Sequence, residues 1–204
     1  MNSIYIYGPK EYSPQSIPSH ILNTTSRSVT YGRAFSPFLL GPIELYNDLI
    51  SQNMENGWQY AKVYPEFVDS IGTPTVSYWD WALSGWNMKR ANRYPMGKNK
   101  HPLCSLWDGK RLGYIEARKQ IYIPLYSQCV RRIPEYEKLL NIFKSQDIHL
   151  WDFDGYSTQE SMQSIIENPN RKMGHAFVLA QCLYQDALER TEMTLGEEVV
   201  LSHR

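Results

Sequence analysis

Apolar positions recur along the chain with two periods, which predict short strands and longer helices. Alternating or continuous apolar runs favour strands at residues 4–7, near 28–31, and at 43–47 and 148–153. Apolar positions spaced by three and four favour helices at residues 54–68, 75–93, 112–122, 134–146, 158–167 and 173–188. Pro37, Gly41 and Pro42 interrupt the apolar segment 35–42, so this segment is expected to be irregular or at a sheet edge.

These elements predict a single helix-rich α+β domain with a few short strands. The sequence shows no internal repeat and no linker, and 204 residues is an ordinary size for one domain. We expect the core to span about residues 30–188 and to be followed by a charged C-terminal tail, 189–204, that frays.

Composition narrows the class of protein only slightly. Apolar residues make up 42% and charged residues 21%, close to the average of soluble globular proteins. The formal net charge is zero, which argues against a dedicated nucleic-acid coat protein but allows a local basic groove. Aromatic residues make up 13%, and such rings often line sites that stack planar groups, although most large apolar side chains are simply buried.

The three cysteines, Cys104, Cys129 and Cys182, form no C-x-x-C pair, and their number is odd. Both facts suit a reducing cytoplasm and argue against a disulfide framework or a zinc site. No H-x-x-x-H motif is present either, so we expect neither a metal nor another cofactor. The N-terminus lacks the pattern of a signal peptide and no run of 18 apolar residues exists, so we expect a cytoplasmic protein without a membrane partner.

The segment from Glu55 to Lys62 carries the first candidate chemistry. On a continuous helix, Glu55, Gln59 and Lys62 lie at i, i+4 and i+7 and therefore share one face. A carboxylate, an amide and an amine on one face can form a catalytic site. The alternative is a solvated polar face, which is the more common arrangement of such residues.

A basic stretch with a Pro/Gly loop follows at residues 89–100. Its candidate phosphate-binding groups are Arg90, Arg93, Gly97 and Lys98, because basic side chains and loop amides suit phosphates. The alternative is a solvated loop. Neither a P-loop nor a Rossmann fingerprint is present.

Two carboxylates, Asp152 and Asp154, follow a short apolar run that ends in Trp151. One of them could polarise a water molecule or stabilise an oxocarbenium ion, as in glycosidic cleavage. A haloacid-dehalogenase D-x-D motif is a weaker interpretation, because the run before it is short and lies late in the chain. His175 is more typical of a structural histidine than of a catalyst.

The order of these segments resembles the NADAR/YbiA-like family over residues 35–183. The matching positions are Phe35 and Ser36 in an F-S-N-F-type segment, Glu55, Gln59 and Lys62 in E-x-x-x-Q-x-x-K, Arg90, Arg93, Gly97 and Lys98 before Trp107, Trp151, Asp154 and Gly155 in a W-G-D-G-type element, and Met173 and Gly174 at the start of a helix. Pro37, Lys98 and the altered segment at Trp151 depart from the family pattern and indicate a divergent member.

The resemblance implies an enzyme that hydrolyses an N-glycosidic bond of an ADP-ribosylated nucleobase, and DNA that carries such a base is one implied partner. It also implies a link with toxin–antitoxin and phage-defence systems, in a host cytoplasm if the protein is viral. Glu55, Lys62 and Asp154 are then the candidate catalytic residues. The remaining positions of the motifs bind substrate, with Trp107 and Trp151 stacking planar rings and Arg90, Arg93 and Lys98 holding phosphates.

Two alternatives stay open on the sequence. The substrate could instead be a small phosphoribosylamino metabolite, such as an intermediate of riboflavin synthesis. The chain could also be a non-catalytic module that binds ADP-ribose, but the retained Glu55 and Lys62 speak against a dead site.

Overall fold

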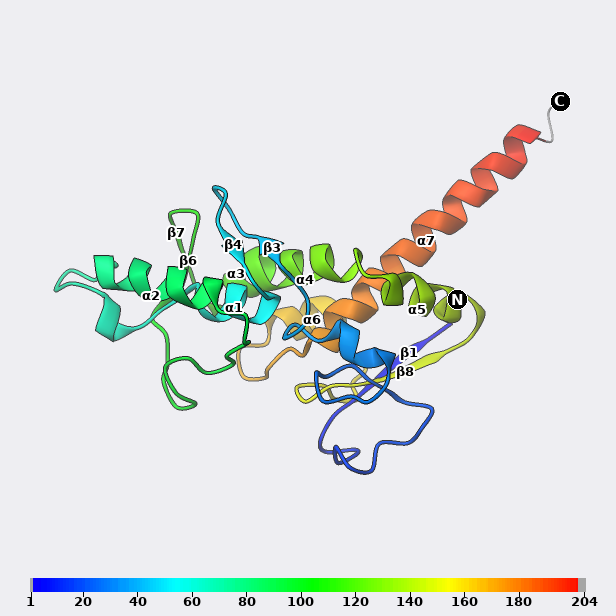
Figure 1. Cartoon of the computed structure of the whole chain (residues 1–204). Coiled ribbons are helices and arrows are strands. Elements are labelled where there is room, and N and C mark those ends of the chain that lie inside the picture. Colours follow the sequence, from blue (N-terminus) through cyan, green and yellow to red (C-terminus); the bar gives the residue numbers. More distant parts are fainter. Residues whose placement is uncertain (1, 202–204) are drawn as a thin grey trace.

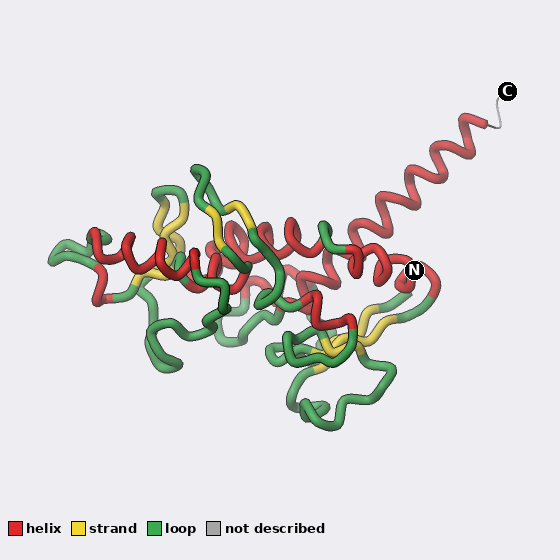
Figure 2. Tube along the Cα trace, in the orientation of Figure 1, coloured by secondary structure: helices red, strands yellow, loops and turns green. Residues whose placement is uncertain are grey.

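The structure is a computed structural model that describes residues 2–201, and the side chains up to residue 189. It forms one α+β domain with small sheets, which confirms the predicted fold class (Figure 1). Most of the chain lies in helices and loops, and the strands are short (Figure 2). One end of the molecule carries α2 and the β6–β7 hairpin, and the parallel sheet lies toward the other end.

The parallel sheet is built from strands at opposite ends of the sequence. β8 (Ile148–Trp151) lies in its centre, between β1 (Ile4–Tyr7) and β2 (Leu22–Asn23). Tyr7 and Asn23 both pair with Trp151, so the carboxyl ends of all three strands meet at one edge. The loops that leave this edge are therefore held close together.

Three helices form the main core beside this sheet. They are α4 (Ile123–Val130), α5 (Pro134–Ser145) and α7 (His175–Leu201). α5 begins with Pro134 at its first turn, where the missing N–H costs no hydrogen bond, and buries Leu139, Leu140 and Phe143. The predicted apolar stripe of α7 is buried as well, through Phe177, Val178 and Leu183 among others.

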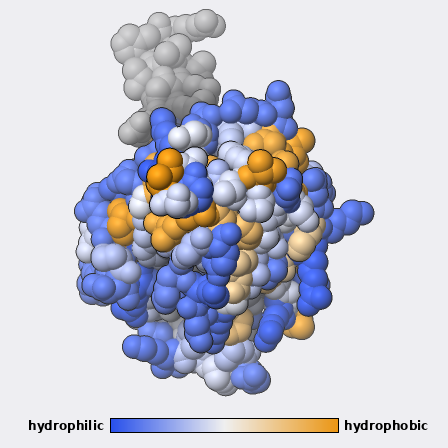
Figure 3. All heavy atoms as spheres, turned by 90° about the vertical axis from the view of Figure 1, so that its left-hand side faces the viewer, coloured by the Kyte–Doolittle hydropathy of each residue, from blue (hydrophilic) through white to orange (hydrophobic). Residues whose placement is uncertain are grey.

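A second, aromatic core lies at the other end of the molecule. α2 (Val76–Asn87) packs there beside the antiparallel sheet β5 (Lys62–Val63), β6 (Cys104–Trp107) and β7 (Lys110–Leu112). Tyr60, Tyr78 and Trp86 are buried between them. Several apolar patches remain on the mostly hydrophilic surface of this end (Figure 3), and Ile71 and Val76 are among the exposed apolar residues of the chain.

The short helix α1 (Met54–Gln59) connects the two cores. Asn53 caps it by accepting a hydrogen bond from the amide of Asn56 at 2.9 Å. All six residues of α1 are buried. The hairpin of β3 (Ile43–Glu44) and β4 (Ile50–Ser51) precedes it, so the strand expected at 43–47 is shorter than predicted.

One helical rod passes from α3 (Tyr114–Ala117) through a π-helical turn, η3 (Arg118–Tyr122), into α4. Pro124 lies in the first turn of α4 and has no N–H to donate, which accounts for a widened turn just before it. The predicted helix at 112–122 is therefore longer than expected and continues past the proline. π-turns occur frequently at functional sites, and Arg118 and Tyr122 bound this one.

Several sequence-based boundaries are wrong. The helix expected over 54–68 ends at Gln59, after which the chain forms β5 and a 3-10 turn, η2 (Pro65–Phe67). The strand expected near 28–31 is absent from the described fold, and a 3-10 helix, η1 (Tyr31–Phe35), follows instead. The helix expected at 158–167 is the shorter α6 (Met162–Glu167).

The C-terminus also differs from expectation. α7 continues to Leu201, so the helix expected at 173–188 is longer than predicted. Residues 202–204 lie outside the described residues, and the same holds for the charged side chains from residue 190 onward. Within the described part of the chain, no helix is long and apolar enough to cross a membrane.

Candidate active site

A cavity of about 530 Å³ opens at the carboxyl edge of the parallel sheet. Its walls are the loops after β2 and β8, helix α1, the π-turn and the start of α7. In open sheets with parallel strands, ligands bind at this edge, and this volume lies in the range of small-molecule sites. The lining residues used below are Ser36, Glu55, Gln59, Lys62, Arg93, Asp152, Asp154, Met173 and His175.

Glu55, Gln59 and Lys62 form a continuous hydrogen-bonded chain in one wall of the cavity. The amide of Gln59 donates to Glu55 Oε1 at 2.9 Å, and its carbonyl oxygen accepts from Lys62 Nζ at 2.6 Å. Lys62 Nζ also lies 4.9 Å from the centre of the Trp58 ring. The two bonds fix the orientation of the amide, because each end of it meets a charged partner of the matching kind.

Burial shifts the pKa values of both charged ends toward neutrality. Glu55 is 5% exposed, and desolvation raises the pKa of its carboxyl, although Gln59 and Lys62 oppose this shift. Desolvation lowers the pKa of Lys62 to about 8, while the negative charge of Glu55 opposes the decrease. The free amine is therefore more populated near neutral pH than in an ordinary lysine, which favours a nucleophilic role.

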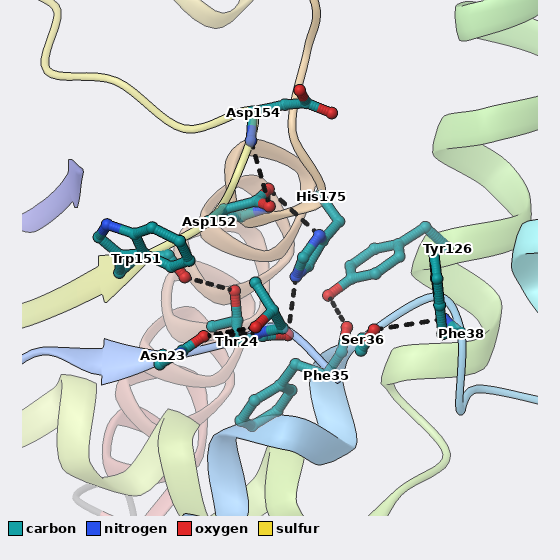
Figure 4. Close-up of polar contacts among 12 residues, drawn as sticks. Asn23, Thr24, Phe35, Ser36, Phe38, Tyr126, Trp151, Asp152, Asp154 and His175 are labelled. Carbon is teal, nitrogen blue, oxygen red and sulfur yellow. Dashed lines mark hydrogen bonds and ion pairs between the residues drawn. The ribbon is translucent and has the colours of Figure 1, made fainter. Parts of the chain in front are cut away.

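A second carboxylate faces the same cavity. Asp154 forms an ion pair with Arg93, and both side chains are partly exposed. The amide of Asp154 donates to Asp152 Oδ1 at 3.4 Å, so the position of Asp154 depends on that of Asp152 (Figure 4).

Asp152 and His175 form a buried pair under the cavity. Asp152 Oδ2 lies 3.1 Å from His175 Nδ1 and accepts from the amide of Ala176 at 3.3 Å, which caps the start of α7. The other ring nitrogen of His175, Nε2, lies 3.0 Å from the carbonyl oxygen of Thr24, which follows β2 (Figure 4). One histidine thus joins the ends of β2, β8 and α7.

Both ring nitrogens of His175 therefore face oxygen acceptors. A neutral imidazole has one N–H. Hydrogen bonds at both ring nitrogens therefore require a second proton, which is held by the ring or by the Asp152 carboxyl. Both side chains are buried, and the ring nitrogens are already engaged with the protein. The geometry suits a positioning role better than direct proton transfer to a substrate.

Positive charge prevails around the cavity. The cationic lining residues are Arg27, Lys62, Arg93, Arg118 and Lys172, and the acidic ones are Glu55, Asp152 and Asp154. Arg118 is buried and donates to backbone carbonyls, among them Ile166 at 3.0 Å and Asn168 at 2.7 Å. It has no carboxylate partner among the described residues, so its charge remains uncompensated beside the cavity.

The structure brings together only part of the predicted site. The predicted residues that line the cavity are Ser36, Glu55, Gln59, Lys62, Arg93, Asp154 and Met173. Phe35 is buried in the main core beside them and does not line it. Gly155 and Gly174 do not line it either, but they allow close approach of the backbone: a Cβ at Gly174 would lie 2.2 Å from Asp152 Oδ2.

The predicted ring-stacking and phosphate roles need correction. Trp151 is fully buried and donates its indole N–H to the Tyr12 carbonyl at 2.9 Å, and Trp107 packs edge-on against Tyr46 in the hairpin region. Neither ring lines the cavity. Arg90, Gly97 and Lys98 are exposed and also lie outside its lining. These residues lie close to Arg93 in the sequence, but in the structure they lie away from the cavity.

Sequence reasoning missed other lining residues, which are Thr25, Ser26, Arg27, Phe38, Tyr94, Tyr114, Arg118, Tyr122, Phe153 and Lys172. Most stand alone in loops or at helix ends and form no motif. His175, interpreted as a structural histidine, lines the cavity as well. No group of three or more His, Cys, Asp or Glu side chains in the described part of the chain is arranged to hold a metal ion.

Fold and site together define a single α+β domain with a positively lined cavity at the edge of a parallel sheet. The chain belongs to a family of unknown function, DUF6939, whose model matches residues 10–179. No curated protein matches the chain, and no solved structure matches it.

Proposed function

We propose that this protein is an N-glycosidase, similar to the NADAR/YbiA-like family, that hydrolyses the bond between ribose C1′ and the base nitrogen of an ADP-ribosylated nucleobase. The observation that carries the proposal is the Glu55–Gln59–Lys62 chain in the cavity wall, with a carboxyl of raised pKa and an amine of pKa about 8. Perturbed pKa values of this kind concentrate at functional sites.

The cations around the cavity support an anionic substrate. Arg27 and Lys172 lie outside the Glu55–Lys62 chain and line the cavity where they can face the phosphates of ADP-ribose. Arg118 is buried and bonded to backbone carbonyls, so it contributes positive charge to the cavity without a direct contact. Phe38, Tyr94 and Phe153 replace the two tryptophans as the candidate rings for stacking a base, because they line the cavity and are at least partly exposed.

Two routes of cleavage fit these groups. In the first, ionised Glu55 takes a proton from a water molecule that attacks C1′ as the bond to the base breaks, and the departing base nitrogen takes a proton from solvent. In the second, the free amine of Lys62 attacks C1′, and protonated Glu55 gives its proton to the departing base nitrogen. Ring opening of the ribose then gives an imine at Lys62, and water hydrolyses the imine to release ADP-ribose and regenerate the amine.

The test of the proposal is release of ADP-ribose from ADP-ribosylated thymidine and guanosine oligonucleotides, followed by mass spectrometry. Removing an essential acid–base or nucleophilic group typically costs about 10²–10⁴-fold in rate, so we expect Glu55→Gln and Lys62→Ala each to lose at least about 100-fold in kcat while staying folded. Borohydride should trap an adduct on Lys62 if the imine route operates. If both variants keep near-normal turnover, the proposed function is wrong.

A further inference from the structure

A second cavity, of about 470 Å³, lies along β1 and is separate from the candidate active site. It is enclosed by β1, the loop after β8, α6 and α7, and it shares no lining residue with the first cavity. Its volume lies in the range of small-molecule sites. Its aromatic lining residues are Tyr5, Tyr7, Tyr156, Phe177 and Tyr184.

The charges around this cavity differ from those of the first one. Among the lining residues that the structure describes, Glu160 is the only one with a charged side chain, and it is exposed. The remaining lining is aromatic, aliphatic or neutral polar, with Ile4, Ile6 and Met162 among the aliphatic members. Phosphates and carboxylates would lose their hydration there without gaining a cation, so the cavity favours an uncharged ligand.

Two polar groups in this lining have no hydrogen-bond partner among the described residues. Tyr156 is 4% exposed, and its hydroxyl has no partner. The carbonyl oxygen of the Gln181 side chain is buried and also lacks a partner. The Tyr156 ring is held in place by Phe177, at 4.7 Å between ring centres, and by the Arg171 guanidinium on its face. Buried polar groups nearly always have partners, and such exceptions indicate a missing one.

We propose that this second cavity binds a small, uncharged, planar molecule that carries both a hydrogen-bond donor and an acceptor. Its donor pairs with the Gln181 carbonyl oxygen, its acceptor takes the hydrogen bond of the Tyr156 hydroxyl, and its ring packs among the aromatic side chains. The proposal rests on this cavity alone and does not depend on the N-glycosidase activity.

The test uses three probes that share one ring system. 2-Naphthamide is uncharged and has a donor and an acceptor, 2-naphthoate replaces the amide with a charge, and 2-methylnaphthalene has no polar group. We expect saturable 1:1 binding of 2-naphthamide to the full chain by calorimetry, with binding of 2-naphthoate at least about tenfold weaker because no cation meets its charge. Absence of saturable 2-naphthamide binding would overturn the proposal.

Variants then locate the bound probe. Tyr156→Phe removes only the unpartnered hydroxyl, so it should leave the fold intact. It should weaken the binding of 2-naphthamide and leave the binding of 2-methylnaphthalene unchanged. Ala180→Trp fills the cavity from α7 and should abolish binding of both. Lys172→Ala in the first cavity should change neither. If 2-naphthamide binds Tyr156→Phe as well as it binds the parent, or if it still binds a folded Ala180→Trp protein, the assigned site is wrong.

Discussion

Lys62 lies between charges of opposite sign, and these charges act on its pKa in opposite directions. Glu55 raises the pKa of Lys62, whereas the nearby charge of Lys172 lowers it. We therefore expect Glu55→Gln to move the pKa of Lys62 below about 8 and Lys172→Met to move it above about 8. An NMR titration of the Lys62 side chain measures both shifts directly.

The matched control is Tyr94→Phe, which removes the hydroxyl bonded to Lys172 at 3.1 Å but keeps the positive charge. It should leave the pKa of Lys62 nearly unchanged. The amine is free above its pKa, so in the imine route the rise of kcat/KM with pH should shift to lower pH in Glu55→Gln and to higher pH in Lys172→Met. Shifts of the same sign in both variants would contradict this account of the site.

Gly174 has a specific steric reason to be glycine. A Cβ there would lie 2.2 Å from Asp152 Oδ2, so Gly174→Ala must displace the carboxylate that holds His175 and the amide of Asp154. Overpacking of this kind costs about 1–3 kcal/mol, which urea unfolding measures. Misplacing groups around a reacting centre can cost on the order of 10²-fold, so kcat should fall as well.

Gly113→Ala is the control for this change, because a Cβ at Gly113 would meet no atom within 4 Å. It should leave stability and turnover close to those of the parent. If Gly174→Ala behaves like Gly113→Ala, Asp152 and His175 do not position the site.

At single positions, sequence reasoning was most effective where polar residues follow one another at the spacing of a helix face. It grouped Glu55, Gln59 and Lys62, and the structure does place them side by side. The reason given was partly wrong, because Lys62 reaches Gln59 from a strand and not from the same helix. Arg118 was missed and His175 was interpreted only as a structural histidine, since an isolated arginine or histidine shows its role only once its distant partners are known.

At the level of elements, the hairpin of β6 and β7 was missed, although the sequence contains a motif that is typical of its turn. Asp108 and Gly109 form the turn with φ of 46° and 75°, and an Asp-Gly pair between strands is a strong hairpin signal. The helix over 54–68 was overextended for a different reason. Its apolar residues continue past Gln59, but the backbone of Lys62 and Val63 pairs with β6, which lies far along the chain.

The same turn gives a prediction for stability. Gly109 has positive φ, so Gly109→Ala should destabilise the folded protein by about 1–2 kcal/mol, the cost of placing a side chain in that region. Asp108→Asn should have little effect, because asparagine tolerates the same conformation. Urea unfolding measures both changes. Turnover of Gly109→Ala should equal that of the parent, since the turn contributes no side chain to the cavity.

For the whole molecule, the distribution of charged side chains says more about the candidate active site than the net charge of zero does. Cations are concentrated around the candidate active site, whereas Lys100, at the end of the basic stretch, pairs with Glu66, and Lys119 pairs with Glu167. Of the four candidate phosphate-binding groups in that stretch, only Arg93 lines the cavity. Net charge and composition could not show this, because they do not record which charges lie together.

This arrangement predicts a salt effect on substrate binding. For an ADP-ribosylated oligonucleotide, KM should rise with added salt, because cations that contact phosphates release counterions on binding. Arg27→Ala and Lys172→Ala should raise KM more than they lower kcat, and they should reduce the salt dependence. Equal rates and equal salt dependence for an ADP-ribosylated oligonucleotide and a free nucleotide would favour a small-metabolite substrate.

The central position of β8 has a consequence for how the protein is made. β1 and β2 leave the ribosome early, but they pair with β8 and not with each other. The sheet edge that carries the site therefore cannot assemble until most of the chain has been translated. Until then the N-terminal strands of the nascent polypeptide have open edges, which makes unfinished chains a natural target for chaperones that shield exposed strands.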